Sequence, residues 1–190
     1  MSDQESIPLT SSELGYLWTG YSINEMSKWY LKIFRGQAKD QEIKNLYSFA
    51  IQKTTELLKT RKEILLREGY PISVGFSEMD IDRSSPPLFS DRFILSYLHG
   101  GSRLGLDFHS RAFSLATRVD VRKYLLDCVN FSLQLHENVV NLLLHKGLYL
   151  RTPSLPAPTS QETIQKNSYL SGWFGDSRPM NSMEIANHYL

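Results

Sequence analysis

The amino-acid sequence predicts an all-α protein that folds as a four-helix bundle, with a long crossover loop between the second and third helices and an extended C-terminal tail. Four long stretches repeat apolar residues at helical spacing, and each begins beside a residue that can cap a helix. A proline-rich segment follows the fourth stretch and is typical of an extended linker. We therefore expect residues 1–150 to form the bundle and residues 151–190 to form the linker and tail.

The first helix is expected from Thr10 to about Phe34, with Gly36 as its end. Thr10 and Glu13 have the spacing of a capping box, in which each side chain accepts a hydrogen bond from the other residue's backbone. Two faces of this helix are apolar, so it should be covered from two sides, as in a bundle or a dimer. One face holds Tyr16, Ile23, Met26, Tyr30 and Ile33, and the other holds Leu14, Trp18, Tyr21 and Trp29.

The second helix is expected from about Asp40 to Gly69. About 29 residues at 1.5 Å each span about 43 Å, a length that suits a four-helix bundle. The loop at residues 70–89 contains three prolines and is long enough to be a crossover connection, with one short turn at residues 77–80. The end of the second helix is crowded with cations that favour the helix dipole, namely Lys59, Arg61, Lys62 and Arg67.

The third helix is expected from its cap at Ser90 to about Arg118, and it contains Gly100, Gly101 and Gly105. A glycine inside a helix costs about 1 kcal/mol relative to alanine. Close approach of a neighbouring helix is expected to offset this cost, and a bound ligand is the alternative.

The fourth helix is expected from Val121 to Lys146, with Asp120 as its cap and Gly147 just beyond its end. The tight corner before it makes the third and fourth helices an antiparallel hairpin. Residues 179–185 repeat the pattern of residues 8–14, a proline followed by an apolar residue, a cap residue and a later glutamate. This similarity indicates the beginning of a second repeat, with Asn181 as its helix cap.

Composition excludes several classes of protein. Lysine and arginine number 21 against 20 aspartates and glutamates, so the formal net charge is +1, without the strong positive field of a nucleic-acid binder. The single cysteine, Cys128, excludes an internal disulfide and a cysteine-based zinc site, and we expect it to be an inert core thiol. No secretory signal is present, and no apolar run reaches the roughly 18 residues of a membrane span. We therefore expect a cytoplasmic protein that binds neither nucleic acid nor membrane.

The motifs of catalytic sites are missing from the sequence. A dimetal site in a helical bundle needs Glu-x-x-His on two helices, but Glu56 is followed by Lys59 at this spacing and Glu137 by Val140. HExxH, phosphate-loop, GxSxG and GxGxxG motifs are also missing. We expect no catalytic activity, no cofactor and no bound metal.

Two alternative readings of the candidate site stay open. Glu25, His99 and His136 could form a mononuclear metal site, because Glu25 lies on an apolar face and the hairpin brings both histidines toward one layer. Hydrogen-bonded core or rim residues would explain the same pattern. The glycine-rich face of the third helix could instead bind a small molecule, which a pocket lined by Gly101 and Tyr97 would support.

Large aromatic residues are the candidates for an interface. Trp173 and Phe174 lie between glycines beyond the proline-rich linker, close to Tyr169, and such residues dominate interface energetics. Trp18 and Trp29 on the second apolar face of the first helix are further candidates. We expect a homodimer, and the tail could pack on its own chain or on a neighbouring one.

Six segments carry a family resemblance: LTSSELGYLW at 9–18, PISVGFSEMDI at 71–81, PLFSDRF at 87–93, RVDVRKYLLDC at 118–128, LLLHKGLYLRTP at 142–153 and YLSGWFGDSRPMNSMEI at 169–185. They resemble an uncharacterised family from spore-forming bacteria, whose members are often tandem duplications and are commonly labelled putative spore coat proteins. The resemblance covers nearly the whole chain and implies a ferritin-like four-helix bundle. It supplies no catalytic residues.

The function implied by the resemblance is that of a non-catalytic structural or interaction protein of the spore coat or of sporulation. Its partners would be a second copy and other coat proteins, and it would be deposited in the coat. The alternative is a metal-binding ferritin-like protein, or an oxidoreductase with a non-standard site.

Overall fold

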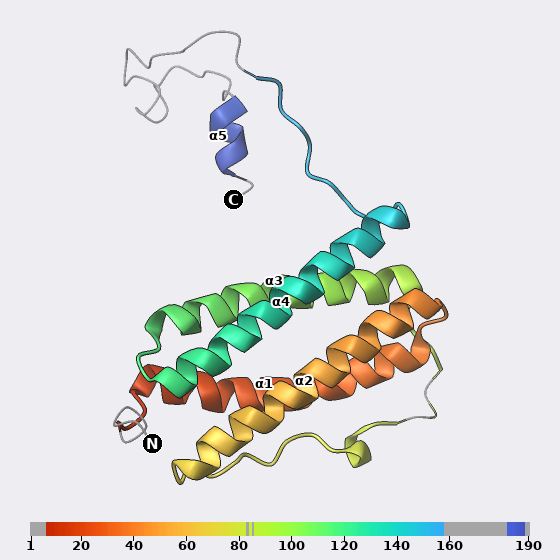
Figure 1. Ribbon diagram of the computed structural model, residues 1–190. Helices are drawn as coiled ribbons and strands as arrows, with labels where there is room; N and C mark the ends of the chain where they lie inside the picture. The colour runs from red at the N-terminus through yellow and green to blue at the C-terminus, as the bar shows by residue number, and fades with distance from the viewer. Residues whose placement is uncertain (1–6, 83, 85, 158–181, 189–190) are drawn as a thin grey trace, which may run out of the picture. The chain divides into compact units, whose positions relative to one another are not determined.

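The computed structural model spans all 190 residues, and the structure describes residues 7–82, 84, 86–157 and 182–188. The chain divides into two units, Met1–Tyr149 and Leu150–Leu190. The first unit contains four long helices, α1 (Ser11–Gln37), α2 (Gln41–Arg67), α3 (Asp91–Leu115) and α4 (Val119–His145) (Figure 1). The second unit contains a short helix, α5 (Ser182–Asn187). Since the described residues contain helices and no strand, the predicted all-α class is confirmed.

The topology of the bundle is that of a ferritin-like fold. Helices α1 and α2 form one hairpin and α3 and α4 form a second, while α2 also packs on α4 and α1 on α3. The connection between α2 and α3 runs the length of the bundle and contains a short 3₁₀ helix, η2 (Glu78–Asp80) (Figure 1). This crossover makes α2 and α3 parallel, so that each pair of packed neighbours is antiparallel.

The helix caps at the beginning of α1, α2 and α3 agree with the sequence. Thr10 and Glu13 form the expected capping box at α1, and Asp40 accepts hydrogen bonds from the backbone N–H groups of Glu42 and Ile43 at α2. Ser90 caps α3. Gly69 and Gly147 follow α2 and α4 with φ of 76° and 66°, the left-handed conformation that glycine adopts without steric cost.

Three predicted helix boundaries are wrong. Helix α1 continues through Gly36 and ends at Gln37, with Ala38 as its C-cap. It ends there because the carboxylate of Asp91 accepts hydrogen bonds from the backbone N–H groups of Lys39 and Asp40 and holds the chain in a turn. Helix α3 ends at Leu115 instead of about Arg118, and α4 begins at Val119 with no side-chain cap. The predicted cap of α4, Asp120, lies inside the first turn instead.

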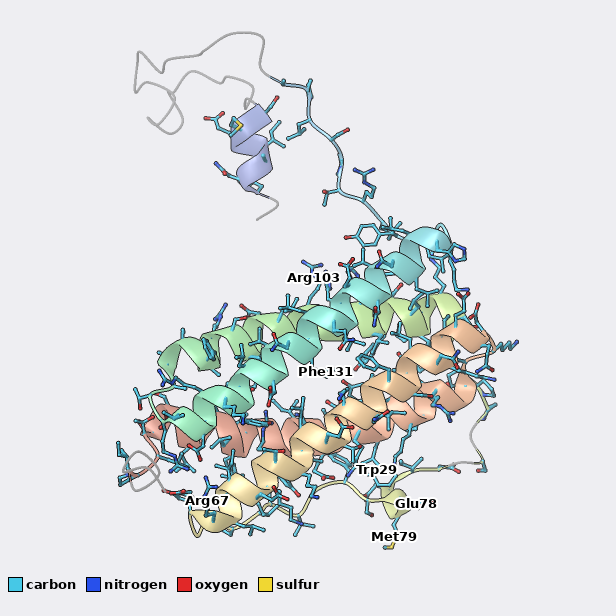
Figure 2. The ribbon with its side chains drawn as sticks, viewed as in Figure 1. Trp29, Arg67, Glu78, Met79, Arg103 and Phe131 are labelled. Atoms are coloured by element: carbon cyan, nitrogen blue, oxygen red, sulfur yellow. The ribbon has the colours of Figure 1, made fainter. Side chains whose placement is uncertain are left out.

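The crossover loop packs on part of the second apolar face of α1, at Trp29. Trp29 donates a hydrogen bond from its indole nitrogen to the carbonyl oxygen of Phe76 at 2.7 Å, and the Ser22 and Ser73 hydroxyls are 3.0 Å apart. Figure 2 shows Trp29 on the side of the bundle that carries this loop. The two-sided covering expected for α1 is therefore met on this side by the chain's own loop.

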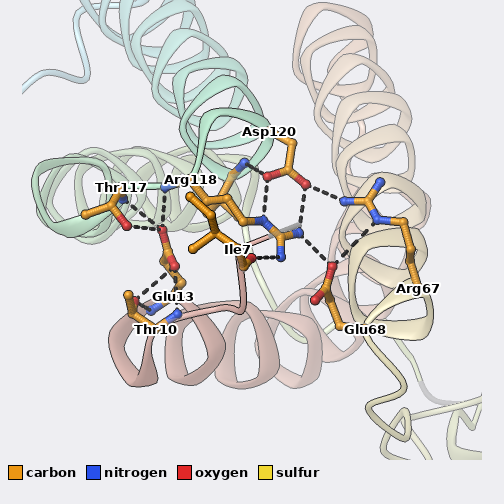
Figure 3. Close-up of polar contacts among 9 residues, drawn as sticks. Ile7, Thr10, Glu13, Arg67, Glu68, Thr117, Arg118 and Asp120 are labelled. Atoms are coloured by element: carbon orange, nitrogen blue, oxygen red, sulfur yellow. Dashed lines mark hydrogen bonds and ion pairs between the residues drawn. The ribbon is translucent and has the colours of Figure 1, made fainter. Parts of the chain in front are cut away.

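One end of the bundle is held by a buried carboxylate, that of Glu13 (Figure 3). One of its oxygens accepts hydrogen bonds from the N–H and hydroxyl of Thr10 at 2.8 and 3.0 Å. The other accepts the backbone N–H groups of Thr117 and Arg118 at 2.8 and 2.9 Å. These backbone groups lie in the corner between α3 and α4, so a single carboxylate caps α1 and fixes the second hairpin.

The side chain of Arg118 extends this corner toward α2 (Figure 3). It is almost fully buried and donates hydrogen bonds to both carboxylate oxygens of Asp120, at 2.8 and 2.9 Å. It also lies 2.8 Å from the carboxylate of Glu68 and donates a hydrogen bond to the carbonyl oxygen of Ile7. The ends of all four helices are thus held together at one place. Asp120 contributes its carboxylate, which accepts two parallel hydrogen bonds from the planar guanidinium of Arg118.

We predict that Glu13→Gln destabilises the protein by about 2 kcal/mol, because an amide nitrogen would face N–H donors that a carboxylate satisfies. Burial acts to raise the pKa of Glu13, but hydrogen bonds from Arg118, Thr10 and Thr117 outweigh it and leave the pKa below 4.5. At a pH above the ordinary pKa of glutamate, the ionised Glu13 carboxylate stabilises the folded protein. This stabilisation is lost as the pH falls through the lowered pKa of the folded state.

Urea denaturation at a series of pH values between neutral and acidic measures this contribution. The wild type should lose more stability than Glu13→Gln as the pH falls below the ordinary glutamate pKa. Glu63→Gln is the control, since Glu63 is exposed on α2 with only a distant Lys59 partner. Equal acid sensitivity of the wild type and Glu13→Gln would contradict the assigned role.

Candidate functional site

A fully buried arginine, Arg61 of α2, lies in the core of the bundle. Its Nε donates a hydrogen bond to the hydroxyl of Tyr124 of α4 at 2.7 Å, and its Nη2 donates one to the hydroxyl of Tyr16 of α1 at 3.2 Å. The guanidinium carbon is also 5.1 Å from the centre of the Tyr16 ring and 5.4 Å from that of Tyr124. Two tyrosines therefore hold the cation through their hydroxyls and their ring faces.

The charge of Arg61 has no carboxylate partner within ion-pair distance in the described part of the chain. Its Nη1 is buried without a hydrogen-bond partner among the described residues. Gly20 of α1 provides the space for the guanidinium, because a Cβ atom there would lie 2.1 Å from Nη1. The removal of a cation from water costs several kcal/mol, so this arrangement leaves an incompletely compensated positive charge.

His109 of α3 continues the polar chain, with its Nδ1 hydrogen-bonded to the Tyr16 hydroxyl. Burial and the nearby charge of Arg61 lower the pKa of His109 to about 4, so the imidazole is neutral at neutral pH. Burial also raises the pKa of Tyr16 and that of the Cys128 thiol, which contacts the same cluster. The tyrosine and the thiol are therefore uncharged, and Arg61 is the one ion of the network.

A cavity of about 390 Å³ lies beside this network, lined by residues of all four helices. Its apolar wall includes Leu31, Ala50 and Leu98, which belong to the core cluster around Tyr47 and Ile94. Small residues provide the space, since Gly101 and Gly105 belong to its wall, together with hydroxyl groups from Thr54, Ser102 and Ser132.

The glycines of α3 therefore have different roles. Gly105 allows α3 and α4 to approach closely, because a Cβ there would lie 2.9 Å from the Ser132 hydroxyl of α4. Gly100 and Gly101 have no such neighbour within 4 Å, so the packing explanation is wrong for both of them. Gly101 lines the cavity, where the ligand alternative applies, although Tyr97 is not among the lining residues.

The three residues of the alternative metal site are not brought together. His99 and His136 stack with ring centres 5.3 Å apart. Glu25 instead binds Lys28 at 2.9 Å and lies against Gly75 of the crossover loop, on the other side of α1. No group of three histidine, cysteine, aspartate or glutamate side chains within the described ranges is arranged to hold a metal ion.

The histidine pair has hydrogen bonds of its own. Ser102 donates to the carbonyl oxygen of His99 at 2.8 Å and therefore accepts from Nδ1 of His136 at 3.1 Å. Burial, with neighbouring positive groups, lowers the pKa of His99. Because the ring planes are nearly parallel, at 22°, their in-plane lone pairs do not point at a common position.

The aromatic interface candidates have different surroundings. Trp18 is 47% exposed, whereas Trp29 is half-buried by the crossover loop and by Lys32, whose Nζ lies 4.1 Å from its ring centre. Tyr169, Trp173 and Phe174 lie outside the described residues, as does the predicted cap Asn181.

The comparisons with known proteins agree with this architecture. A family described as "Protein of unknown function (DUF3231)" matches residues 1–160. The chain belongs to this family. No curated protein sequence matches the chain.

Two solved structures share the fold. A putative spore coat protein from Bacillus halodurans C-125 is 21% identical, with a TM-score of 0.74 over 82% of this chain and 100% of the other. A two-domain protein from Anabaena variabilis ATCC 29413, containing DJ-1/ThiJ/PfpI-like and ferritin-like domains, is 13% identical, with a TM-score of 0.58 over 80% of this chain. The alignment spans 42% of that second protein. No helix among the residues that the structure describes could cross a membrane.

The burial of Arg61 is unexpected from the sequence, where Arg61 belongs to the group of cations at the end of α2. The signal was present, since Arg61 continues the helical spacing of the buried residues Ala50, Thr54 and Leu58. Its burial shows that this spacing outweighed the polarity of the side chain.

We predict that Gly20→Ala destabilises the protein by about 1–3 kcal/mol, because the new methyl group would lie 2.1 Å from Nη1 and displace the Arg61 guanidinium. Gly15→Ala in the same helix is the matched control. Gly15 is exposed with no neighbour within 4 Å, so this change should stabilise the helix by about 1 kcal/mol. Thermal or urea denaturation measures both variants, and equal effects would contradict the contact between Gly20 and Arg61.

Proposed function

We propose that this protein is a non-catalytic structural protein of the spore coat, in which a ferritin-like bundle serves as a scaffold. The observation that carries the proposal is the occupation of the bundle core by Arg61 and its two tyrosines. Metal sites of ferritin-like proteins need inward carboxylates and histidines on facing helices. Here a cation lies inside, and the adjacent histidine, His109, is hydrogen-bonded to Tyr16.

The description of one solved structure with the same fold supports this role. The protein from B. halodurans, which matches over its whole length, is itself described as a putative spore coat protein. The sequence has no catalytic motif, and the described residues contain no group of three histidine, cysteine, aspartate or glutamate side chains such as a metal-dependent oxidase needs.

We further propose that the protein is a homodimer paired through the outer face of α4. Four branched apolar side chains are exposed there, at spacings of seven and eleven residues that return to nearly the same side of a helix. They are Val119 at 42%, Leu126 at 46%, Leu133 at 51% and Leu144 at 51% exposure. A second copy related by a two-fold axis would cover this stripe with an identical one.

The scaffold role predicts that the purified protein does not retain metal. After incubation with Fe²⁺, Mn²⁺ or Zn²⁺ and removal of free ions, elemental analysis should find much less than one ion per chain. The reason is that the core presents a cation and no convergent set of ligands. One tightly held ion per chain, removed by substitution of His99 or His136, would contradict the proposal and favour the metal-binding alternative.

The dimer proposal predicts a solution mass of twice 21.9 kDa at micromolar concentration. Leu133→Glu should shift the mass to that of one chain, because a buried unpaired carboxylate is costly in an apolar interface. Leu66→Glu is the matched control, since Leu66 has a similar exposure of 53% but lies at the end of α2. Light scattering coupled to gel filtration measures both, and a wild-type mass of one chain would overturn the proposal.

A further inference from the structure

The cavity beside His109 has the properties of a small-molecule site. Its volume of about 390 Å³ lies within the range of sites that hold drug-sized ligands. Apolar side chains from α1 and α3 line its outer part, and three of them are exposed, Ile23 at 44%, Leu104 at 73% and Phe108 at 36%. The cavity therefore opens to solvent between these two helices, with an apolar mouth and hydroxyl groups inside.

The polar chain behind the cavity fixes which nitrogen of His109 carries a proton. Arg61 can only donate, so the Tyr16 oxygen accepts from it. The Tyr16 proton then goes to Nδ1 of His109, because an imidazole nitrogen is a stronger acceptor than the nearby Cys128 thiol. Since the ring is neutral, its proton lies on Nε2.

This Nε2–H group is available to a ligand. The hydrogen bond that His109 makes with Tyr16 uses Nδ1, and no hydrogen bond among the described residues uses Nε2. His109 lines the cavity, and the ring carbon next to Nε2, Cδ2, lies 3.9 Å from the position that a Cβ of Gly105 would take on the cavity wall. A ligand that reaches this part of the wall would need an acceptor to pair with the Nε2–H group.

The charge of the network selects the kind of acceptor. Arg61 lies behind Tyr16 and His109 with no carboxylate of its own, so the inner end of the cavity has a positive potential. Asp107 at the rim is exposed and paired with Arg111 at 3.0 Å, which neutralises its opposing charge. An anionic acceptor is therefore favoured over a neutral one.

We propose that the central cavity of the bundle binds a small monocarboxylate with an apolar tail. Its carboxylate accepts the Nε2–H of His109 and compensates the charge of Arg61, and its tail lies between Ile23, Leu104 and Phe108. This binding site goes beyond the scaffold role and does not depend on it, since ligand binding and coat assembly are measured separately.

The test uses octanoate as the probe and octanamide as its neutral analogue, titrated into the full-length protein by calorimetry and by NMR of the histidine side chains. Octanoate should bind saturably and shift the His109 resonances. Octanamide should bind about tenfold more weakly, because it lacks the charge that Arg61 attracts.

A pair of variants localises the site without disturbing the buried network. Gly101→Leu adds a side chain to the cavity wall where no atom lies within 4 Å, and it should abolish octanoate binding while the protein stays folded. Gly100→Leu is the matched control, because this neighbouring glycine is equally unobstructed but does not line the cavity, and it should bind octanoate like the wild type. Lack of saturable binding, unchanged binding in Gly101→Leu, or equal affinities for octanoate and octanamide would each overturn the proposal.

Discussion

The burial of a guanidinium without a carboxylate partner is the constraint on which the interior of this bundle depends. Arg61 requires a glycine on α1 for space and two tyrosines, one on α1 and one on α4, for hydrogen bonds and ring contacts. Its charge helps to keep His109 neutral, and the Tyr16 hydroxyl orients that imidazole. Through Tyr16 and His109, this residue sets the polarity at one end of the cavity, while small residues of the wall provide its space.

A second polar centre explains why distant segments of the sequence belong together. Glu13 in the capping box of α1 accepts the backbone N–H groups of Thr117 and Arg118, and Arg118 binds Glu68 and Asp120. Carboxylates in this corner satisfy backbone groups that would otherwise be orphaned at helix ends. The two polar centres differ in kind, since Arg118 has two carboxylate partners in this corner, Glu68 and Asp120, while Arg61 has none among the described residues.

Much of the fold could be predicted from the sequence because the information is local. Helical spacing of apolar residues placed the four helices, and Thr10, Asp40 and Ser90 act as caps in the structure as they do in the sequence pattern. The errors arose where a residue distant in the sequence determines the end of a helix. Asp91 determines where α1 ends, and Glu13 determines the corner between α3 and α4, neither of which a local pattern contains.

The candidate site was harder to predict for the same reason. The sequence motifs for such sites consist of inward acids and histidines, whereas the structure buries an arginine, Arg61. Only the helical spacing of Arg61 indicated that it belongs to the core. His99 and His136 were expected in one layer and do meet, but Glu25 is held by Lys28 and the crossover loop. Gly101 could be assigned to a cavity only once the space around it was known.

The most direct test of this account is the state of the His109 ring in the folded protein, measured by NMR of the imidazole nitrogens as a function of pH. The account predicts a neutral ring protonated on Nε2, which takes up a second proton only near pH 4 because burial and Arg61 oppose it. A ring that titrates at an ordinary histidine pKa, or one protonated on Nδ1, would contradict the hydrogen-bonded chain from Arg61 through Tyr16.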